Sequence, residues 1–262
     1  MVSFIEVLGP AGSGKTTLIN SISAELKTLG IVSTRKLVIG ALPKLSPRNL
    51  IIRLSNVERE NLWATPDLLR RNLGLDSITT SFHASKFKDD YNLLLETHLR
   101  ILWASDSPLQ RKILIQKFYI NLLLCHQLIS NKFENEHLFS LFDEGILSNT
   151  RGVSPKLLAK ISKKSNLLPK ILVVCECNPD ITLTRRNARD RLRMNYIEGS
   201  KSEVLERRTL IIEQRKRTLE LAKHHQGIGS IVIKLDISDL ENAKTNLLKQ
   251  LKPALYKLGN SI

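Results

Sequence analysis

Residues 9–16 read Gly-Pro-Ala-Gly-Ser-Gly-Lys-Thr, a stretch that fits the phosphate-binding pattern G-x-x-x-x-G-K-[ST]. Glycines let a backbone curl until successive N–H groups point inward at a phosphate. The lysine of the pattern puts a positive charge on the outer phosphates, and the hydroxyl after it can ligate Mg²⁺. The residues expected to bind ATP are Gly9, Ala11, Gly12, Ser13, Gly14, Lys15, Thr16 and Thr17. Thr16 is also expected to hold Mg²⁺.

The segments on either side of this loop have the periodicities that the pattern requires. Residues 2–8 form an apolar run rich in β-branched side chains, which is typical of a strand. Residues 17–26 carry apolar side chains at helical spacing, and Gly30 is a candidate helix end. Strand, glycine loop and helix therefore follow one another in the order of a phosphate-binding loop.

Further short apolar runs are expected to form strands, and they cover residues 34–39, 138–143, 170–175 and 230–235. Segments with helical spacing separate them. Short apolar strands that alternate with helices indicate a parallel sheet that is buried on both faces. We therefore predict an α/β fold in three layers, in which helices flank a five-stranded parallel sheet.

The length and composition favour one cytoplasmic domain over residues 1–262. No apolar run reaches the ~18 residues needed to cross a bilayer, so we expect no membrane span. The chain enters the first strand at once, which argues against a signal peptide. Three cysteines favour a reducing compartment, and Cys175 and Cys177 are expected to pack in the interior.

The charge is unevenly distributed along the chain, whose formal net charge is +15. Residues 1–150 contain 17 Lys and Arg against 14 Asp and Glu, whereas residues 151–262 contain 23 against 11. A basic surface attracts nucleic acid, anionic membranes or phosphorylated small molecules. Nucleic acid is the less favoured partner, because seven Phe, four Tyr and two Trp offer little base stacking.

A long insertion separates the second and third expected strands. Residues 107–110 look like a helix start, with Ser107 as the cap, Pro108 at the first helical position and Gln110 completing a capping box. Residues 40–106 are less regular. Because insertions beside strand C-termini lie over the ligand crevice, we expect this segment to cover the acceptor site. A structural extension or a homodimer contact is the alternative.

The third expected strand ends in Phe142, Asp143, Glu144 and Gly145. A carboxylate at a strand end beside a phosphate loop can hold Mg²⁺ or accept a proton from an attacking hydroxyl. Asp143 is the preferred residue for both roles, and Glu144 is the alternative base. Gly145 is expected to permit a tight exit turn.

An arginine-rich segment, residues 184–193, follows the fourth expected strand. It lies past a helix start at Pro179, and Arg185 and Arg189 share one helical face. Arginines that close over a transferring phosphoryl group stabilise its charge. We therefore expect residues 178–200 to form a lid. Its functional arginines are expected to be Arg185 and Arg189 in catalysis and Arg186 and Arg191 in nucleotide binding.

The charged segment that follows, residues 203–223, is expected to be a helix. Its arginines and lysines alternate with glutamates, so we interpret them mostly as a solvated face. Residues 235–238 close the fifth strand and form a loop that can contact the nucleotide base.

The order of these features resembles the P-loop kinases that phosphorylate small molecules, especially the thymidylate kinase-like and deoxynucleoside kinase-like branch. Thymidylate kinases carry an Asp after the third strand and a Ser five positions later, and Asp143 and Ser148 match these positions. Glu144 and Gly145 replace the Arg and Tyr of that family. Residues 185–191 look similar to its lid. The resemblance implies the strand order 2-3-1-4-5, with ATP and Mg²⁺ as cofactors.

The sequence therefore predicts an ATP-dependent kinase with a small-molecule acceptor. The resemblance implies a nucleoside or nucleotide. The first strand and loop also look like kinase-type proteins of cell-surface polysaccharide functions, which leaves a sugar or glycan precursor open. Two other classes remain as alternatives: a nucleic-acid-acting P-loop ATPase or polynucleotide kinase, and a non-catalytic nucleotide-binding module.

Overall fold

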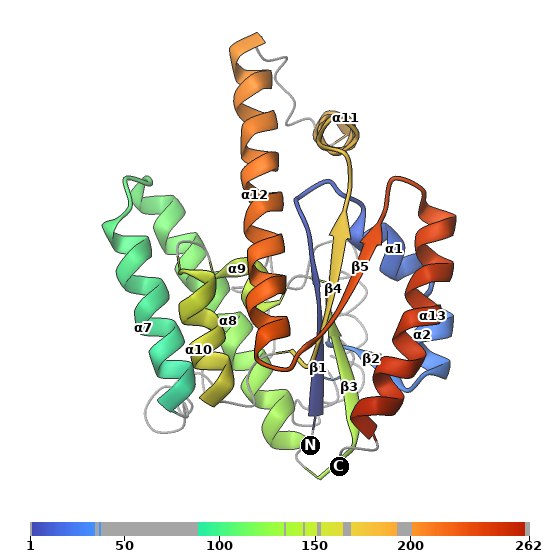
Figure 1. The fold of residues 1–262 in the computed structure, drawn as a ribbon. Helices are drawn as coiled ribbons and strands as arrows, with labels where there is room; N and C mark the ends of the chain where they lie inside the picture. Colours follow the sequence, from blue (N-terminus) through green and yellow to red (C-terminus); the bar gives the residue numbers. More distant parts are fainter. Residues whose placement is uncertain are drawn as a thin grey trace, which may run out of the picture.

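The computed structural model of the chain describes residues 2–34, 37, 89–133, 135–143, 145–150, 153–164, 169–192 and 201–259. Its centre is a five-stranded parallel sheet in the order β2-β3-β1-β4-β5 (Figure 1). The strands are β1 (Val2–Leu8), β2 (Ile31–Ser33), β3 (Leu138–Phe142), β4 (Ile171–Glu176) and β5 (Ile231–Asp236). The predicted α/β class, the parallel sheet and the strand order are confirmed.

Helices cover both faces of this sheet (Figure 1). One face carries α1 (Lys15–Ser21), α2 (Ser23–Thr28) and α13 (Leu240–Gly259). The other carries α7 (Asp89–Ala104), α8 (Leu109–Lys132), α9 (Ile146–Asn149), α10 (Pro155–Lys164) and α12 (Lys201–Gly227). The remaining helix, α11 (Pro179–Leu192), lies beyond the C-terminal end of β4.

Strand β1 divides the hydrophobic core into two layers, and every residue of the strand is buried. Successive side chains of a strand point to opposite faces of the sheet. Phe4 and Leu8 therefore join the core layer that contains Tyr119 of α8, whereas Ile5 and Val7 join the layer built on α1 and α13. This central position fixes where the loop that follows β1 leaves the sheet.

The second strand lies earlier in the chain than predicted. The sequence predicts residues 34–39, but β2 covers Ile31–Ser33, and Thr34 already lies outside it. Gly30 has a φ of 73°, so the helix ends there and the chain passes directly into the strand. The hydroxyl of Thr34 donates to the carbonyl of Leu141, which is 2.8 Å away, in place of a further ladder bond. Apart from Thr34 and Leu37, the predicted strand falls outside the described residues.

Two helix predictions also need correction. The helix expected over residues 17–26 is interrupted at Ile22, where α1 ends and α2 begins. The Ser21 hydroxyl donates to the Leu18 carbonyl at this break and competes with the helical bonding. The capping box predicted at residues 107–110 does not form, because Pro108 itself is the N-cap and α8 begins at Leu109 without a side-chain cap.

Within the described part of the chain, no helix combines the length and the apolar character that a membrane span requires. The predicted acceptor-site segment, residues 40–106, is described only from residue 89 onward. There it forms α7, which packs beside α8 and places Leu94 in the core. Its remainder, like residues 193–200 of the predicted lid, lies outside the described residues.

Candidate functional site

The loop between β1 and α1, residues 9–14, is packed so tightly that side chains are excluded at two of its glycines; we call it the glycine loop. Gly9 and Gly12 have φ values of 155° and 89°, which L side chains rarely adopt. A Cβ at Gly9 would lie 2.7 Å from the backbone oxygen of Cys175, at the end of β4. One at Gly12 would lie 3.0 Å from the Thr182 carbonyl of α11. The loop is thus held against the edge of the sheet and against α11.

Lys15, the first residue of α1, folds back over this loop. Its ammonium donates to the carbonyl oxygens of Gly9, at 2.7 Å, and Pro10, at 3.0 Å, and the residue is buried. The hydroxyl of Ser13 is also buried and has no hydrogen-bond partner among the described residues. Thr16, the predicted Mg²⁺ ligand, is exposed in the first turn of α1. The Lys15 ammonium and the hydroxyls of Ser13 and Thr16 therefore all lie at the glycine loop or at the start of α1.

Asp143 lies beside the glycine loop because β1 and β3 are adjacent. Glu6 is opposite Phe142 in the parallel register, so the next residue, Asp143, is level with Val7. Asp143 thus directly follows the strand next to β1, two residues short of the level at which the glycine loop begins, and both segments leave the same edge of the sheet. Asp143 is half-buried and forms no hydrogen bond or ion pair with the described residues. Glu144, the alternative base, lies outside the described residues.

A second acid, Glu6 of β1, was not among the predicted site residues. Its carboxylate is buried on the face of β1 that contacts α9. One oxygen, Oε2, accepts from the Leu147 N–H at 3.1 Å. The other, Oε1, accepts from the N–H and the hydroxyl of Ser148, at 2.8 and 3.0 Å. Burial raises the pKa of this carboxyl from 4.5 to about 7, and these hydrogen bonds oppose the rise.

Gly145 is required for a different reason from the one expected. Its φ of −95° is accessible to any residue, so the turn itself does not need glycine. A Cβ there would instead lie 2.4 Å from Cδ of Glu6 and 2.5 Å from its Oε2. The missing side chain makes room for the buried carboxylate.

Arg185, on α11, ties together the glycine loop and the segment after β5. Its Nη1 donates to the carbonyl oxygens of Ser13, at 2.9 Å, and Ile237, at 3.1 Å. Its Nη2 donates to the carbonyl oxygen of Ser238, at 3.3 Å. In this structure the guanidinium therefore positions backbone segments around the loop.

The other predicted arginines of α11 lie nearby with different exposure. Arg186 is half-buried, and a Cβ on Gly12 would come within 3.0 Å of its own Cβ. Arg189 and Arg191 are exposed toward the end of the helix. Helix α11 begins at Pro179 as predicted, and the side-chain oxygen of Asn178 accepts from the Asp180 N–H at 2.8 Å.

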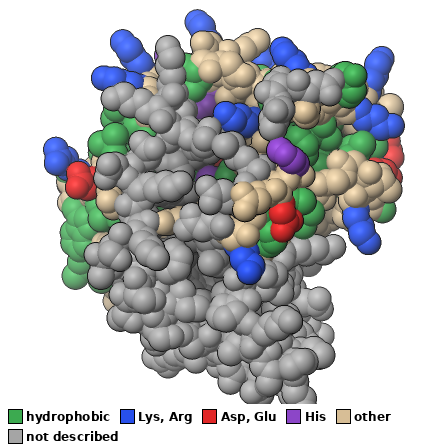
Figure 2. Space-filling view, turned by 90° about the horizontal axis from the view of Figure 1, so that it is seen from below, with side chains coloured by type: hydrophobic (Ala, Val, Ile, Leu, Met, Phe, Trp, Pro, Cys, Tyr) green, Lys and Arg blue, Asp and Glu red, His purple; other side chains and the backbone are tan. Residues whose placement is uncertain are grey.

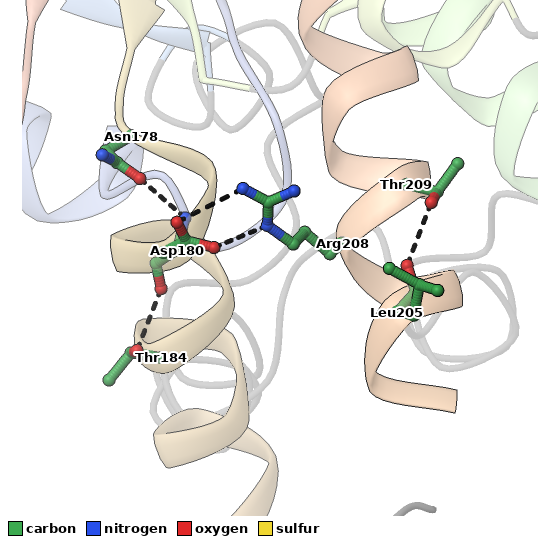
Figure 3. A network of polar contacts seen from close by, with 6 residues as sticks. All are labelled: Asn178, Asp180, Thr184, Leu205, Arg208 and Thr209. Atoms are coloured by element: carbon green, nitrogen blue, oxygen red, sulfur yellow. Dashed lines mark hydrogen bonds and ion pairs between the residues drawn. The ribbon is translucent and has the colours of Figure 1, made fainter. Parts of the chain in front are cut away.

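Helix α12 rises past the C-terminal edge of the sheet (Figure 1), and its arginines are not simply a solvated face. Figure 3 shows Arg208, whose Nε lies 2.7 Å from Oδ1 of Asp180 on α11. This hydrogen bond lowers the pKa of Asp180. Two turns further along α12, Nη2 of Arg215 lies 2.9 Å from Oε2 of Glu176, at the end of β4. These arginines remain partly exposed, as predicted for a mostly solvated face, but each pairs with an acid on another element, which the sequence did not predict.

Two more side chains of α12 reach the candidate site. The Gln214 Oε1 accepts from the Ala11 N–H of the glycine loop, at 3.4 Å. The Arg217 Nη2 donates to the carbonyls of Thr150 and Val153, which follow α9, at 2.6 and 2.9 Å. One helix therefore contacts the glycine loop, the end of β4, the start of α11 and the segment after α9.

Sequence signals for the missed residues did exist. Glu6 is the one charged residue between apolar neighbours in a strand buried on both faces, and such a charge needs partners. Gln214, Arg215 and Arg217 lie on the same part of a helix, but their partners are distant in the sequence. No protein-family model matches the chain, and no curated protein matches it in sequence.

Proposed function

We propose that the chain is a phosphotransferase of the P-loop kinase type, which uses ATP and Mg²⁺ to phosphorylate a small-molecule acceptor. One observation carries the proposal: the glycine loop and Asp143 follow adjacent parallel strands and meet at one edge of the sheet. Positive charge and backbone N–H groups beside a carboxylate are the groups that phosphoryl transfer requires. Ligands of open α/β sheets bind at this edge.

The residues of the loop fit a triphosphate. Its glycines let the backbone pack closely against the end of β4 and α11, and a loop of this kind can direct its N–H groups toward a phosphate. The Lys15 ammonium lies on carbonyls of the loop, and the Ser13 hydroxyl is buried without a partner. Phosphate oxygens can accept from both groups. The loop is therefore assembled before the nucleotide binds.

In the proposed reaction, Lys15 neutralises charge on the outer phosphates. Asp143 orients the acceptor hydroxyl or takes its proton, with Glu144 as the alternative base. Mg²⁺, held by Thr16 and Asp143, would neutralise further charge on the transferring group. Positioning and charge then supply the rate, because phosphoryl transfer asks little covalent chemistry of the protein.

The arginines divide into two groups in this proposal. Arg186, Arg189 and Arg191 close over the transferring phosphoryl group from α11. Arg185, predicted as a catalytic residue, contributes its charge from the fixed position that its carbonyl contacts give it. The acceptor is a nucleoside or nucleotide if the thymidylate kinase-like resemblance extends to the substrate, and a sugar or glycan precursor otherwise.

One specific observation favours a second candidate, a nucleic-acid-acting ATPase or polynucleotide kinase: the net charge of +15. Figure 2 shows the opposite end of the molecule from the glycine loop, and there the Lys and Arg side chains of the described residues are dispersed among other residues. Nucleic-acid-stimulated ATP hydrolysis that weakens steeply with salt would favour this candidate over the small-molecule kinase.

The test is a thermal-shift screen with a non-hydrolysable ATP analogue, followed by transfer assays. Nucleosides, nucleotides, sugars and sugar phosphates are added in turn, and an acceptor raises the unfolding temperature because it binds only the folded protein. The hits are then assayed with ATP and Mg²⁺. ATP binding without transfer to any acceptor would instead favour the alternative that the chain is a non-catalytic nucleotide-binding module.

Lys15→Met is the decisive variant, because it keeps the aliphatic stem and removes the charge. We expect transfer to fall about 100-fold or more, and the unfolding temperature to fall modestly, because the carbonyls of Gly9 and Pro10 lose their donor. Lys27→Met, which removes an exposed lysine of α2, is the matched control and should keep full activity. Full activity of Lys15→Met would refute the proposed function.

A further inference from the structure

The proposed chemistry does not use the buried carboxylate of Glu6. Glu6 belongs to β1, but its carboxylate accepts hydrogen bonds from Leu147 and Ser148 of α9. These residues follow β3 in the chain. Glu6 therefore joins the strand before the glycine loop to the segment after Asp143.

In its ionised form, which prevails above pH 7, Glu6 makes a contact that is specific for a carboxylate. Both oxygens are occupied, Oε2 by the Leu147 N–H and Oε1 by the N–H and hydroxyl of Ser148. A glutamine of the same shape has one acceptor oxygen, and its amide group would face an N–H donor with another donor. An unmatched donor in a buried position is unfavourable. Replacement by Gln should therefore release one side of the contact.

Three further features show that the fold is built around this contact. Gly145 lacks the side chain that would overlap the carboxylate. The hydroxyl of Tyr119 on α8 lies 3.4 Å from the Thr150 hydroxyl, and burial and the charge of Glu6 raise the pKa of Tyr119. Arg217 holds the carbonyl of Thr150 from α12. Residues 145–150 are thus fixed from three elements.

Asp143 itself has no such support. Its side chain makes no hydrogen bond or ion pair with the described residues, so its position depends on what flanks it. On one side is the pairing of β3 with β1, which ends at Phe142. On the other side is the turn at residues 145–148, which Glu6 holds.

We propose that Glu6 is a positioning residue: it anchors residues 145–148 and thereby fixes Asp143 beside the glycine loop. The anchoring follows from the contacts alone, whereas its catalytic consequence rests on the proposed function. Because a misplacement of about 1 Å can lower a rate about 100-fold, the anchor would matter for transfer more than for nucleotide binding.

The experiment compares Glu6→Gln with a control that disturbs the same core layer away from the turn. Leu122→Val of α8 serves as that control, since Leu122 is fully buried in the layer that contains Phe4. Amide hydrogen exchange of residues 145–150 is measured in both variants and in the unaltered chain. We expect Glu6→Gln to accelerate exchange in this segment about tenfold, and Leu122→Val to leave it unchanged relative to the rest of the core.

Kinetics then separate positioning from binding. We expect Glu6→Gln to lower kcat about 100-fold, while the dissociation constant of the ATP analogue stays within about twofold. Ser148→Ala removes one of the three hydrogen bonds and should show the same pattern at smaller size. It keeps the test decisive if Glu6→Gln does not fold.

Unchanged exchange of residues 145–150 in Glu6→Gln would overturn the anchor. Faster exchange with an unchanged kcat would overturn its role in positioning Asp143. If the unaltered chain transfers phosphate to no acceptor, the proposed function fails, while the exchange measurement still decides whether Glu6 holds the turn.

Discussion

Replacing Gly145 by Ala is expected to destabilise the protein, although the backbone at this position suits alanine. With φ at −95° and ψ at −161°, alanine would restrict the unfolded chain and gain about 0.4–1 kcal/mol of stability if space allowed. Space does not allow it, because the new Cβ would lie 2.4 Å from Cδ of Glu6 and 2.8 Å from its Cγ. The carboxylate must move from a fully enclosed position.

The magnitude follows from what this movement breaks. Overpacking of a core costs typically about 1–3 kcal/mol. Displacing the carboxylate also leaves the buried N–H groups of Leu147 and Ser148 without their acceptor, at about 1–3 kcal/mol for an unsatisfied group. Against the small gain from the unfolded state, we expect a net loss of about 3 kcal/mol in the free energy of unfolding.

The assay is urea denaturation of a double-mutant cycle. In the Glu6→Ala background the added methyl group meets empty space, so Gly145→Ala should then raise the unfolding free energy by about 0.4–1 kcal/mol. The coupling between the two positions is the difference between the two effects, about 3–4 kcal/mol. Gly227→Ala is the matched control, because nothing lies within 4 Å of a Cβ there and no destabilisation is expected. An equal cost of Gly145→Ala with and without Glu6 would refute the reasoning.

The remaining predictions concern charge. Burial raises the pKa of Glu6 to about 7, so the folded state holds the carboxyl proton more tightly than the unfolded state does. The contribution of this proton to the free energy of unfolding is complete below pH 4.5 and is lost as the pH rises through 7. Urea denaturation should show that the free energy of unfolding falls by about 2–3 kcal/mol between pH 5 and pH 8, and that Glu6→Gln abolishes this fall. Equal pH profiles of the unaltered chain and Glu6→Gln would contradict the prediction. Arg185→Ala removes the hydrogen bonds by which this side chain clamps three backbone carbonyls, and the variant should lose about 2 kcal/mol in the free energy of unfolding by urea. Arg189→Ala, on the exposed part of α11, should leave this free energy unchanged. Similar effects of both substitutions would contradict the role of Arg185 as a clamp. Arg208→Ala breaks an exposed ion pair, and thermal unfolding should show no change; a large drop would mean that the pair does more than its exposure suggests.

The parts of the fold that could be predicted were those with a local signal. The β-branched run before the glycine loop and the short apolar runs near residues 138, 170 and 230 each specify a strand by composition and length. Their boundaries lie within one residue of β3, β4 and β5. The second strand was missed because residues 31–33 are too few to show a period, and the longer apolar run beyond them was more prominent.

Side-chain partners were harder to predict than strands, because they depend on topology. Arg215 and Glu176 become neighbours only once α12 is laid along the end of β4. Arg185 was predicted as a catalytic residue of a lid, and the sequence does not show that backbone carbonyls beside the glycine loop would accept its hydrogen bonds. Glu6 could have been recognised as unusual in a buried strand, whereas its partners required the position of α9.

The clamp formed by Arg185 has a consequence for how the site attracts anions. Its hydrogen bonds go to neutral carbonyls, so the contacts hold the guanidinium in place without cancelling its charge. Arg215, by contrast, is largely balanced by Glu176. Among the described residues no acid pairs with Arg185, so under the proposed function its fixed positive charge needs no rearrangement on phosphate binding. The same proposal predicts that nucleotide association is fast at low ionic strength and slows as salt screens the field of this charge.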